Sequence, residues 1–214
     1  MMLRSLLLAM MLAVAARAES LVRPGPEIRT PGETTAWAPL LRRLAARSPI
    51  QSTFTERRWF FFRREPVVLE GELRFSRTLG LSLHYTRPTD HTLIIDRSGM
   101  VMRDAKGHDR VPPSDNHVAE LAESMLAIMR FDLHSLMTEF VLHAARSDGT
   151  WRIDLTPRAK QERRILQDIT VFGAGDEVTR LIFEHSRRER VEVDITESHT
   201  LPAFSAADLK RYFR

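Results

Sequence analysis

The sequence predicts an α+β domain in which helices cover one face of a strongly curved antiparallel sheet. Short segments of alternating apolar and polar residues recur through most of the chain, and turn-forming residues separate them at regular intervals. Two further stretches have apolar side chains at helical spacing. The expected order is one helix, about five strands, one or two helices and about four more strands.

Residues 1–18 have the pattern of a secretory signal peptide. A short basic start, Met1–Arg4, precedes the apolar run Leu6–Ala16, and Ala16-Arg17-Ala18 is a small-x-small cleavage site. The run is shorter than the roughly 20 apolar residues that a membrane-spanning helix needs. We expect cleavage after Ala18 and a mature protein in the bacterial periplasm.

The composition narrows the function of an exported chain. There is no cysteine, which excludes disulfides and a lipid attached to a first mature cysteine. The 43% of hydrophobic residues and only 9 glycines predict one packed domain. A sequence pI of about 10.1 would suggest nucleic acid inside a cell, but export excludes that partner, and the formal net charge is only +4. The basic surface could instead bind anionic lipid or an acidic partner, or it could simply be solvated.

The predicted domain begins after a Pro- and Gly-rich leader. Residues 19–35 contain Pro24-Gly25-Pro26 and Pro31-Gly32 and show little periodicity, so we assign the single domain to residues 36–214. A helix is expected over Ala36–Ala46, and Ser48-Pro49 ends it. Its apolar face would carry Trp37, Leu40, Leu41, Leu44 and Ala45.

The strands are predicted by alternation. In the clearest one, Leu69, Gly71, Leu73 and Phe75 alternate with Glu70, Glu72, Arg74 and Ser76, so one face should be apolar and the other wet. The same pattern occurs around residues 81–86, 151–156 and 191–195. Turn signals at residues 87–90, 97–99, 106–107, 147–149 and 173–176 favour a meandering sheet.

A helical segment interrupts the strands after Pro112-Pro113. Ser114 or Asp115 can cap it. Its apolar stripe would be Val118, Leu121, Ala122, Met125, Leu126 and Met129. A second short helical piece is expected over Leu133–Val141.

No motif in the chain indicates catalysis, a metal or a cofactor. There is no Gly-x-Ser-x-Gly elbow, no His-Glu-x-x-His and no Gly-rich phosphate loop before a helix. The 8 histidines are dispersed along the chain. We therefore predict no catalytic residues, no metal and no cofactor, and a binding or transport role.

Two features suggest more than packing. Arg77 continues the apolar series of Leu73 and Phe75, so it either bonds to carbonyls at a cavity edge or is an ordinary strand-end arginine that reaches water. The run Trp59, Phe60, Phe61 and Phe62 lies between arginine pairs at the expected join of the first two strands. It could form a cavity mouth or touch a membrane interface, or both of its faces could be buried.

With these segments placed, the chain resembles the LolA family of periplasmic lipoprotein carriers from about Leu41 to the C-terminal region. The resemblance is carried by the order of four landmarks: Phe54-Thr55-Glu56-Arg57, the strand Gly71–Arg77, Leu83–Pro88 followed by Leu93–Asp96, and Trp151–Pro157 before Ile165–Phe172. The family usually has Arg-Pro where this chain has Arg77-Thr78, and Asp-Gly where it has Asp96-Arg97-Ser98-Gly99. These departures suggest a divergent member with another acylated or polyene cargo.

The resemblance implies an unclosed antiparallel barrel, helices forming a lid over an apolar cavity, and no enzymatic activity. It matches Arg77 to the family's lid-holding arginine. The residues expected to line the cavity and lid are Phe54, Leu69, Leu73, Phe75, Arg77, Leu81, Leu83, Tyr85, Leu93, Ile95, Met125 and Met129.

The leading hypothesis is a monomeric periplasmic carrier that takes an acylated lipoprotein or other lipid from an inner-membrane donor to an outer-membrane acceptor, with transient contact to the membrane surface. The alternative is an envelope-stress or regulatory module that senses lipids with the same fold and binds a membrane protein partner.

Overall fold

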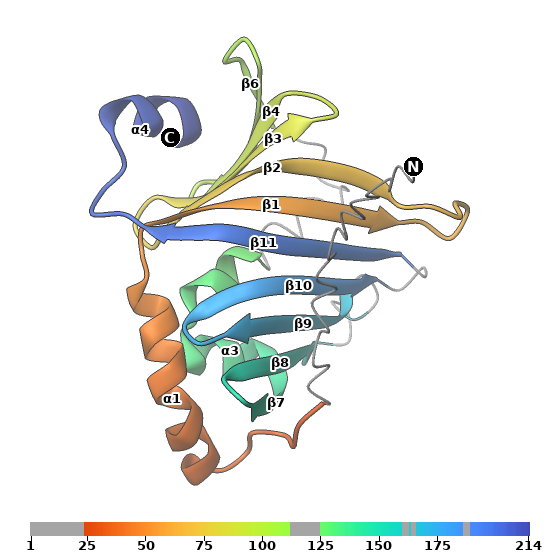
Figure 1. Ribbon diagram of the computed structural model, residues 1–214, viewed down its shortest axis with the longest axis vertical. Helices are drawn as coiled ribbons and strands as arrows, with labels where there is room; N and C mark the ends of the chain where they lie inside the picture. The colour runs from red at the N-terminus through yellow and green to blue at the C-terminus, as the bar shows by residue number, and fades with distance from the viewer. Residues whose placement is uncertain (1–23, 112–124, 160–162, 164–165, 186–188) are drawn as a thin grey trace, which may run out of the picture.

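The computed structural model describes residues 24–111, 125–159, 163, 166–185 and 189–214 (Figure 1). Within these ranges, no helix combines the length and apolar character needed to cross a bilayer. The expected signal peptide, and Ser114, Asp115, Val118, Leu121 and Ala122 of the expected second helix, lie outside the described residues.

Eleven antiparallel strands form one sheet that is not closed into a barrel. The strands are β1 (Ile50–Trp59), β2 (Val67–Ser76), β3 (Gly80–Arg87), β4 (His91–Asp96), β5 (Gly99–Asp104), β6 (Asp109–Arg110), β7 (Phe140–Ser147), β8 (Thr150–Pro157), β9 (Leu166–Ala174), β10 (Glu177–His185) and β11 (Arg190–Thr200). Their order is β6-β5-β4-β3-β2-β1-β11-β10-β9-β8-β7, so the only crossover among them is the pairing of β1 with β11. Two meanders are thus joined in the middle, which confirms the predicted unclosed antiparallel sheet.

Helices cover the inner face, by which we mean the face that carries the main apolar core. Residues 125–130 are helical, and α3 (Leu133–Glu139) follows them behind β8–β10 in Figure 1. Asp132 caps α3, since its carboxylate accepts the amide hydrogens of His134 and Ser135. The chain then enters β7 at Phe140, so the helix that we predicted to run to Val141 ends two residues earlier.

Helix α1 (Pro31–Ala46) lies across the end of the sheet and begins earlier than predicted. Thr30 and Glu33 form a capping box, and Pro31 occupies the first turn, where a missing amide hydrogen costs nothing. Pro31-Gly32, which we interpreted as leader, is therefore a helix start. The preceding residues are also part of the fold, because the Ile28 amide donates to the Leu142 carbonyl at 2.8 Å.

Helix α4 (Ala206–Tyr212) covers part of the opposite face of the sheet, beside β3–β5 (Figure 1). Phe204, Tyr212 and Phe213 form a second small core there. The prediction that this face of β2 and β3 is wet holds for Glu70 and Glu72, which are partly exposed, but was wrong for the residues near α4. Beneath and beside α4, the polar residues Arg74, Ser76, Ser82, His84 and Thr92 are each no more than 6% exposed.

Candidate functional site

The candidate site is the apolar inner face of the sheet. The apolar residues predicted to line a cavity are all buried there in one continuous cluster: Phe54, Leu69, Leu73, Phe75, Leu81, Leu83, Tyr85, Leu93, Ile95, Met125 and Met129. Alternation along β2, β3 and β4 places the strand residues on one face, and Met125 and Met129 reach the cluster from the helix at 125–130. The structure therefore brings together the residues that the sequence selected, with the exception of Arg77.

One row across the inner face depends on a glycine. Gly71 pairs with Phe54 on β1 and with Tyr85 on β3. A Cβ on Gly71 would lie 2.2 Å from the His84 carbonyl oxygen and 2.9 Å from the Phe54 ring, so no larger residue fits. The missing side chain lets the Phe54 ring meet Tyr85 edge to face, at 5.3 Å between centroids.

A charged cluster continues the same face beyond the apolar rows. Glu56 follows Phe54 by two positions and is 2% exposed. Its carboxylate accepts the Tyr85 hydroxyl at 2.7 Å and forms an ion pair with Arg58, whose guanidinium also lies 3.5 Å from the Tyr85 oxygen. The His91 ring stacks on Tyr85 at 4.7 Å.

The cluster fixes the protonation of its members. Burial, and then the Glu56 charge, raise the pKa of Tyr85 well above its ordinary value. Burial alone would lower the pKa of Arg58, but Glu56 and Tyr85 outweigh it and the net shift is upward. Arg58 is therefore held as a guanidinium and Tyr85 as a neutral phenol on the inner face of the sheet.

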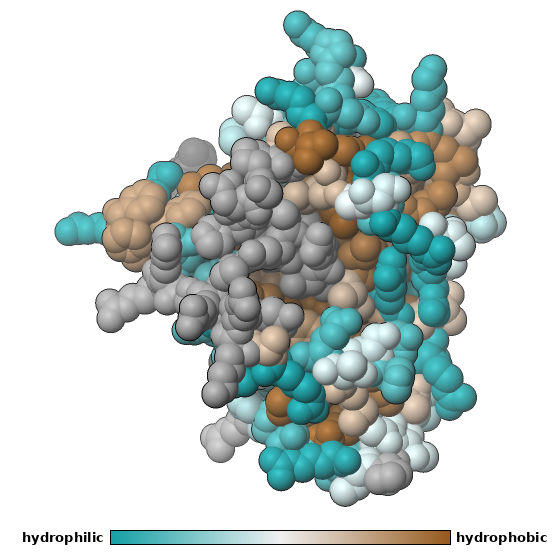
Figure 2. Space-filling model, turned by 180° about the vertical axis from the view of Figure 1, so that it is seen from behind, coloured by the Kyte–Doolittle hydropathy of each residue, from teal (hydrophilic) through white to brown (hydrophobic). Residues whose placement is uncertain are grey.

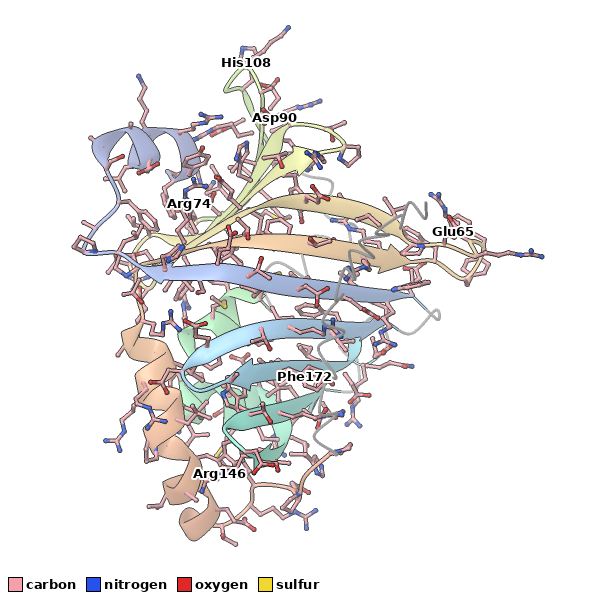
Figure 3. All side chains as sticks on the ribbon, in the orientation of Figure 1. Glu65, Arg74, Asp90, His108, Arg146 and Phe172 are labelled. Atoms are coloured by element: carbon pink, nitrogen blue, oxygen red, sulfur yellow. The ribbon has the colours of Figure 1, made fainter. Side chains whose placement is uncertain are left out.

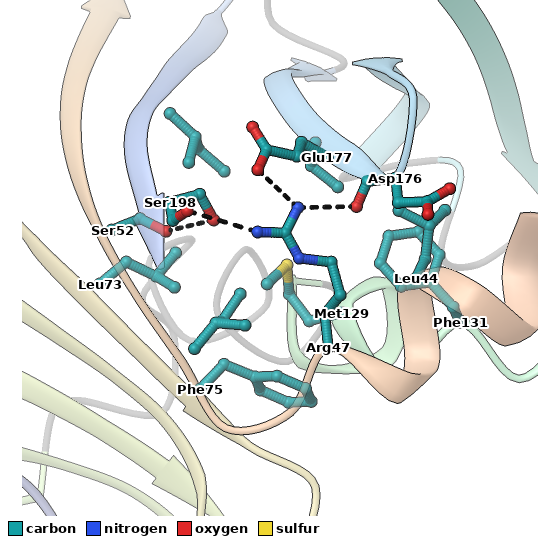
Figure 4. A pocket seen from close by; sticks show the side chains of 13 residues that line it. Leu44, Arg47, Ser52, Leu73, Phe75, Met129, Phe131, Asp176, Glu177 and Ser198 are labelled. Atoms are coloured by element: carbon teal, nitrogen blue, oxygen red, sulfur yellow. Dashed lines mark hydrogen bonds and ion pairs between the residues drawn. The ribbon is translucent and has the colours of Figure 1, made fainter. Parts of the chain in front are cut away.

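Among the described residues, a small cavity and a larger cleft lie between the sheet and the helices. A cavity of about 20 Å³, room for about one water molecule, lies among Leu44, Leu73, Phe75, Met129 and Ile195 (Figure 4). A larger cleft of about 350 Å³ opens between α1 and residues 131–133, within the range of small-molecule sites. Phe131 lines both, and its φ of 49° is a left-handed conformation that favours glycine. In the part of the chain that the structure describes, the helices therefore cover the inner face.

Arg47, the C-cap residue of α1, joins the helix to the sheet (Figure 4). Its Nη1 donates to the Asp176 carbonyl oxygen at 2.9 Å and lies 2.7 Å from Glu177 Oε1. Its Nη2 and Nε donate to the Ser198 carbonyl and the Thr200 hydroxyl oxygens, both at 3.3 Å. One guanidinium thus ties α1 to the β9–β10 turn and to the end of β11.

Of the two positions that the sequence left open for Arg77, the structure shows the strand-end arginine that reaches water and not the one bonded at the cavity edge. Strand β2 ends at Ser76, so Arg77 lies in the turn to β3 and its side chain is exposed. It borders the cleft beside α1, but its guanidinium makes no hydrogen bond or ion pair to any described residue. Only its backbone amide reaches the α1 side, where it donates to the Ser48 hydroxyl at 2.9 Å. Among described residues, the helix-to-sheet bonds that we predicted for Arg77 are made by Arg47.

Trp59–Phe62 form the end of β1 and the turn to β2. Trp59 is half-buried, whereas Phe61 and Phe62 are 69% and 68% exposed. The alternative in which both faces of this segment are buried is thereby excluded for Phe61 and Phe62.

In the part of the chain that the structure describes, no group of three or more His, Asp or Glu side chains could hold a metal ion. His84 and Asp90 do meet at 3.1 Å, but on the opposite face, with Tyr212 against the imidazole.

Comparison with known proteins identifies the family to which the sequence belongs. The family model for outer membrane lipoprotein carrier protein LolA-like matches residues 31–202. The chain belongs to this LolA-like family. No curated protein matches the sequence. Among solved structures, it is similar to a LolA superfamily protein from Nitrosomonas europaea (8% identity, 80% of this chain and 96% of the other, TM-score 0.44) and to a DUF1329 family protein from Desulfovibrio piger (11% identity, 82% and 96%, TM-score 0.46).

Sequence reasoning missed two parts of this LolA-like site. Glu56 and Arg58 continue the inner-face series from Phe54 at two-residue steps, and that spacing was a signal for a charged pair on the apolar face. Arg47 carried no comparable signal, because its partners are 129 to 153 residues away in the chain.

Proposed function

We propose that the protein is a periplasmic carrier that binds the acyl chains of a lipoprotein or lipid on the inner face of its sheet and passes them from the inner to the outer membrane. The observation that carries the proposal is the large apolar face closed by helices whose main polar attachment is Arg47. The LolA-like family supports the cargo class. In this proposal the mature chain, from Glu19, acts as a monomer between an inner-membrane donor and an outer-membrane acceptor.

The energetics favour a site that opens rather than a permanent pocket. One long acyl chain resists crossing water by on the order of 10 kcal/mol, at about 0.8 kcal/mol per methylene. The inner face can offset most of that cost once α1 moves off the sheet, because the helices and the acyl chain cover the same apolar surface. On loading, the bound acyl chain replaces the helices on the inner face. The difference in free energy between these two states sets the affinity for the lipid.

The test combines cargo identification with lipid exchange. Protein purified from the periplasm without detergent is examined by native mass spectrometry and organic extraction, and a bound acylated species is the expected result. Purified protein is then mixed with a fluorescent fatty acid. Arg47→Ala should accelerate uptake and release by roughly 5- to 150-fold, since loss of a charge-assisted attachment costs about 1–3 kcal/mol.

Arg42→Ala is the matched control for this experiment. Arg42 lies on the same helix, but its side chain donates to the Ala38 carbonyl oxygen within α1, so its loss leaves the bonds of Arg47 to the sheet intact. Equal exchange rates in both variants would remove Arg47 from the mechanism. An empty protein that also fails to bind the probe would refute the carrier. Stable retention of both lipid and one membrane protein partner would favour a lipid-sensing module instead.

A further inference from the structure

We propose that the turn between β1 and β2 docks the protein on an anionic bilayer by inserting Phe61 and Phe62 at the lipid interface. We call Phe60–Arg64 the aromatic tip. The proposal goes beyond lipid carriage, because it concerns how the protein meets a membrane and not what its inner face holds.

Exposed aromatic surface is concentrated at the aromatic tip. Phe61 and Phe62 are more than two-thirds exposed, and their rings meet edge to face at 5.2 Å. Phe60 stacks on Phe62 at 5.5 Å, so the rings form one apolar group. In Figure 2 an apolar group projects from the body at the left, with hydrophilic side chains beside it. Grouped rings at a protruding turn expose apolar area that folding itself does not use.

The position of the tip suits insertion. The β1–β2 hairpin extends beyond the neighbouring strands in Figure 1, and Glu65, beside the tip, lies at the far end of the molecule in Figure 3. The rings can therefore reach the boundary between headgroups and acyl chains before the sheet meets the membrane surface. Aromatic side chains favour that boundary, where an apolar body and a polar surrounding are both satisfied.

The charge around the rings selects an anionic surface. Arg57 and Arg58 are already paired with Asp194 and Glu56. Arg63 and Arg64 are exposed and form no ion pair with any described residue, and Glu65 is the single acid in this turn. Two unpaired guanidinium groups next to the inserted rings can bind lipid phosphates, which gives the tip a net attraction to anionic headgroups.

Vesicle flotation tests this docking with the full mature chain. Wild type should bind vesicles of phosphatidylglycerol and phosphatidylcholine and bind pure phosphatidylcholine vesicles at least about five-fold more weakly. Phe61→Ser with Phe62→Ser should reduce binding at least ten-fold, because burial of each ring contributes about ten-fold to partition. Val111→Ser is the control, since Val111 is 80% exposed but lies away from the tip.

A second readout reports the insertion directly. In Phe61→Trp, the added indole should be quenched by brominated lipids in anionic vesicles, beyond the quenching of the native tryptophans in wild type. The double serine variant should still bind the fluorescent fatty acid normally, so failure of docking and failure of lipid carriage are distinguishable. Wild type that ignores both vesicle types, or a double variant that binds like Val111→Ser, would overturn the proposal and assign the tip to a protein partner.

Discussion

Glu56 is a carboxylate 2% exposed on the apolar face of a sheet, and its burial needs compensation. Arg58 supplies the opposite charge and Tyr85 supplies a hydrogen bond at 2.7 Å. A buried pair of this kind contributes little net stability compared with apolar residues of the same size, but removal of one partner leaves an uncompensated charge. The cluster therefore fixes the positions of its side chains at the end of the inner face more than it adds to the stability of the fold.

Tyr85 makes the stability depend on pH in a defined direction. Its pKa is raised in the folded state, so folding favours the protonated phenol. The contribution is fully present below the unfolded-state pKa of about 10 and is lost as the pH rises above it. We expect the free energy of unfolding, measured with urea, to fall above about pH 10 in wild type.

The matched variant is Tyr85→Phe. It keeps the ring contacts with Phe54 and His91 but leaves Glu56 without the hydroxyl, which should cost about 1.5–3 kcal/mol at pH 8. The difference between wild type and the variant should then shrink as the pH rises. A constant difference up to pH 11 would contradict the assignment of this dependence to Tyr85.

At the scale of elements, α4 shows how a short helix changes the environment of a sheet. Arg74 is 4% exposed, and its guanidinium lies 3.7 Å from the centre of the Tyr212 ring (Figure 3). Glu72 binds Arg74 Nη2 at 2.7 Å, while Nε and Nη1 of Arg74 have no hydrogen-bond partner among the described residues. The ring stacking and the Glu72 bond are thus the main compensation for this buried cation.

Tyr212→Ala should lower the free energy of unfolding by about 1–3 kcal/mol. Loss of the buried ring alone would cost about 3–5 kcal/mol, but the opened space lets water solvate Arg74, which offsets part of that cost. Tyr212→Phe keeps the ring and should stay within about 0.5 kcal/mol of wild type. Thermal and urea unfolding measure both. A Phe variant as unstable as the Ala variant would show that the hydroxyl, not the stacking, holds α4.

The elements also show what the sequence could predict. Alternation predicted β2, β3 and their inner faces correctly, because local periodicity is set by the side that packs. The wet face predicted for β2 was wrong at Arg74 and Ser76, because the covering residues of α4 lie more than 120 positions later and no local pattern reports them. The start of α1 was also missed. Pro and Gly indicate a loop by composition, but after Thr30 and before Glu33 they fit the first turn of a helix.

For the whole molecule, the two meanders and the helices differ in how they are held. Each interior strand bonds to two neighbours, and the β1–β11 pairing joins the meanders into one sheet. Helix α1 has no such ladder to the sheet. Beyond apolar contacts, it depends on the Arg47 bonds, an ion pair from Arg43 to Asp176 at 2.7 Å and the stacking of Arg146 on Trp37. In the proposed carrier, the part expected to open is therefore the helical cover.

Hydrogen exchange with and without a bound fatty acid should resolve this division. We expect amides of α1 to exchange faster in the lipid-bound protein, because the acyl chain replaces the helix on the inner face, while amides of β1, β2 and β9–β11 stay protected in both states. Arg47→Ala should bring the lipid-free exchange of α1 towards the lipid-bound rate, and Arg42→Ala should not. If strands deprotect together with α1, opening is a global event, because no stable sheet then remains to hold the cargo. If the amides of both α1 and the strands stay protected with lipid bound, the acyl chain would instead lie in the cleft beside α1 and Phe131, where about 350 Å³ is already open.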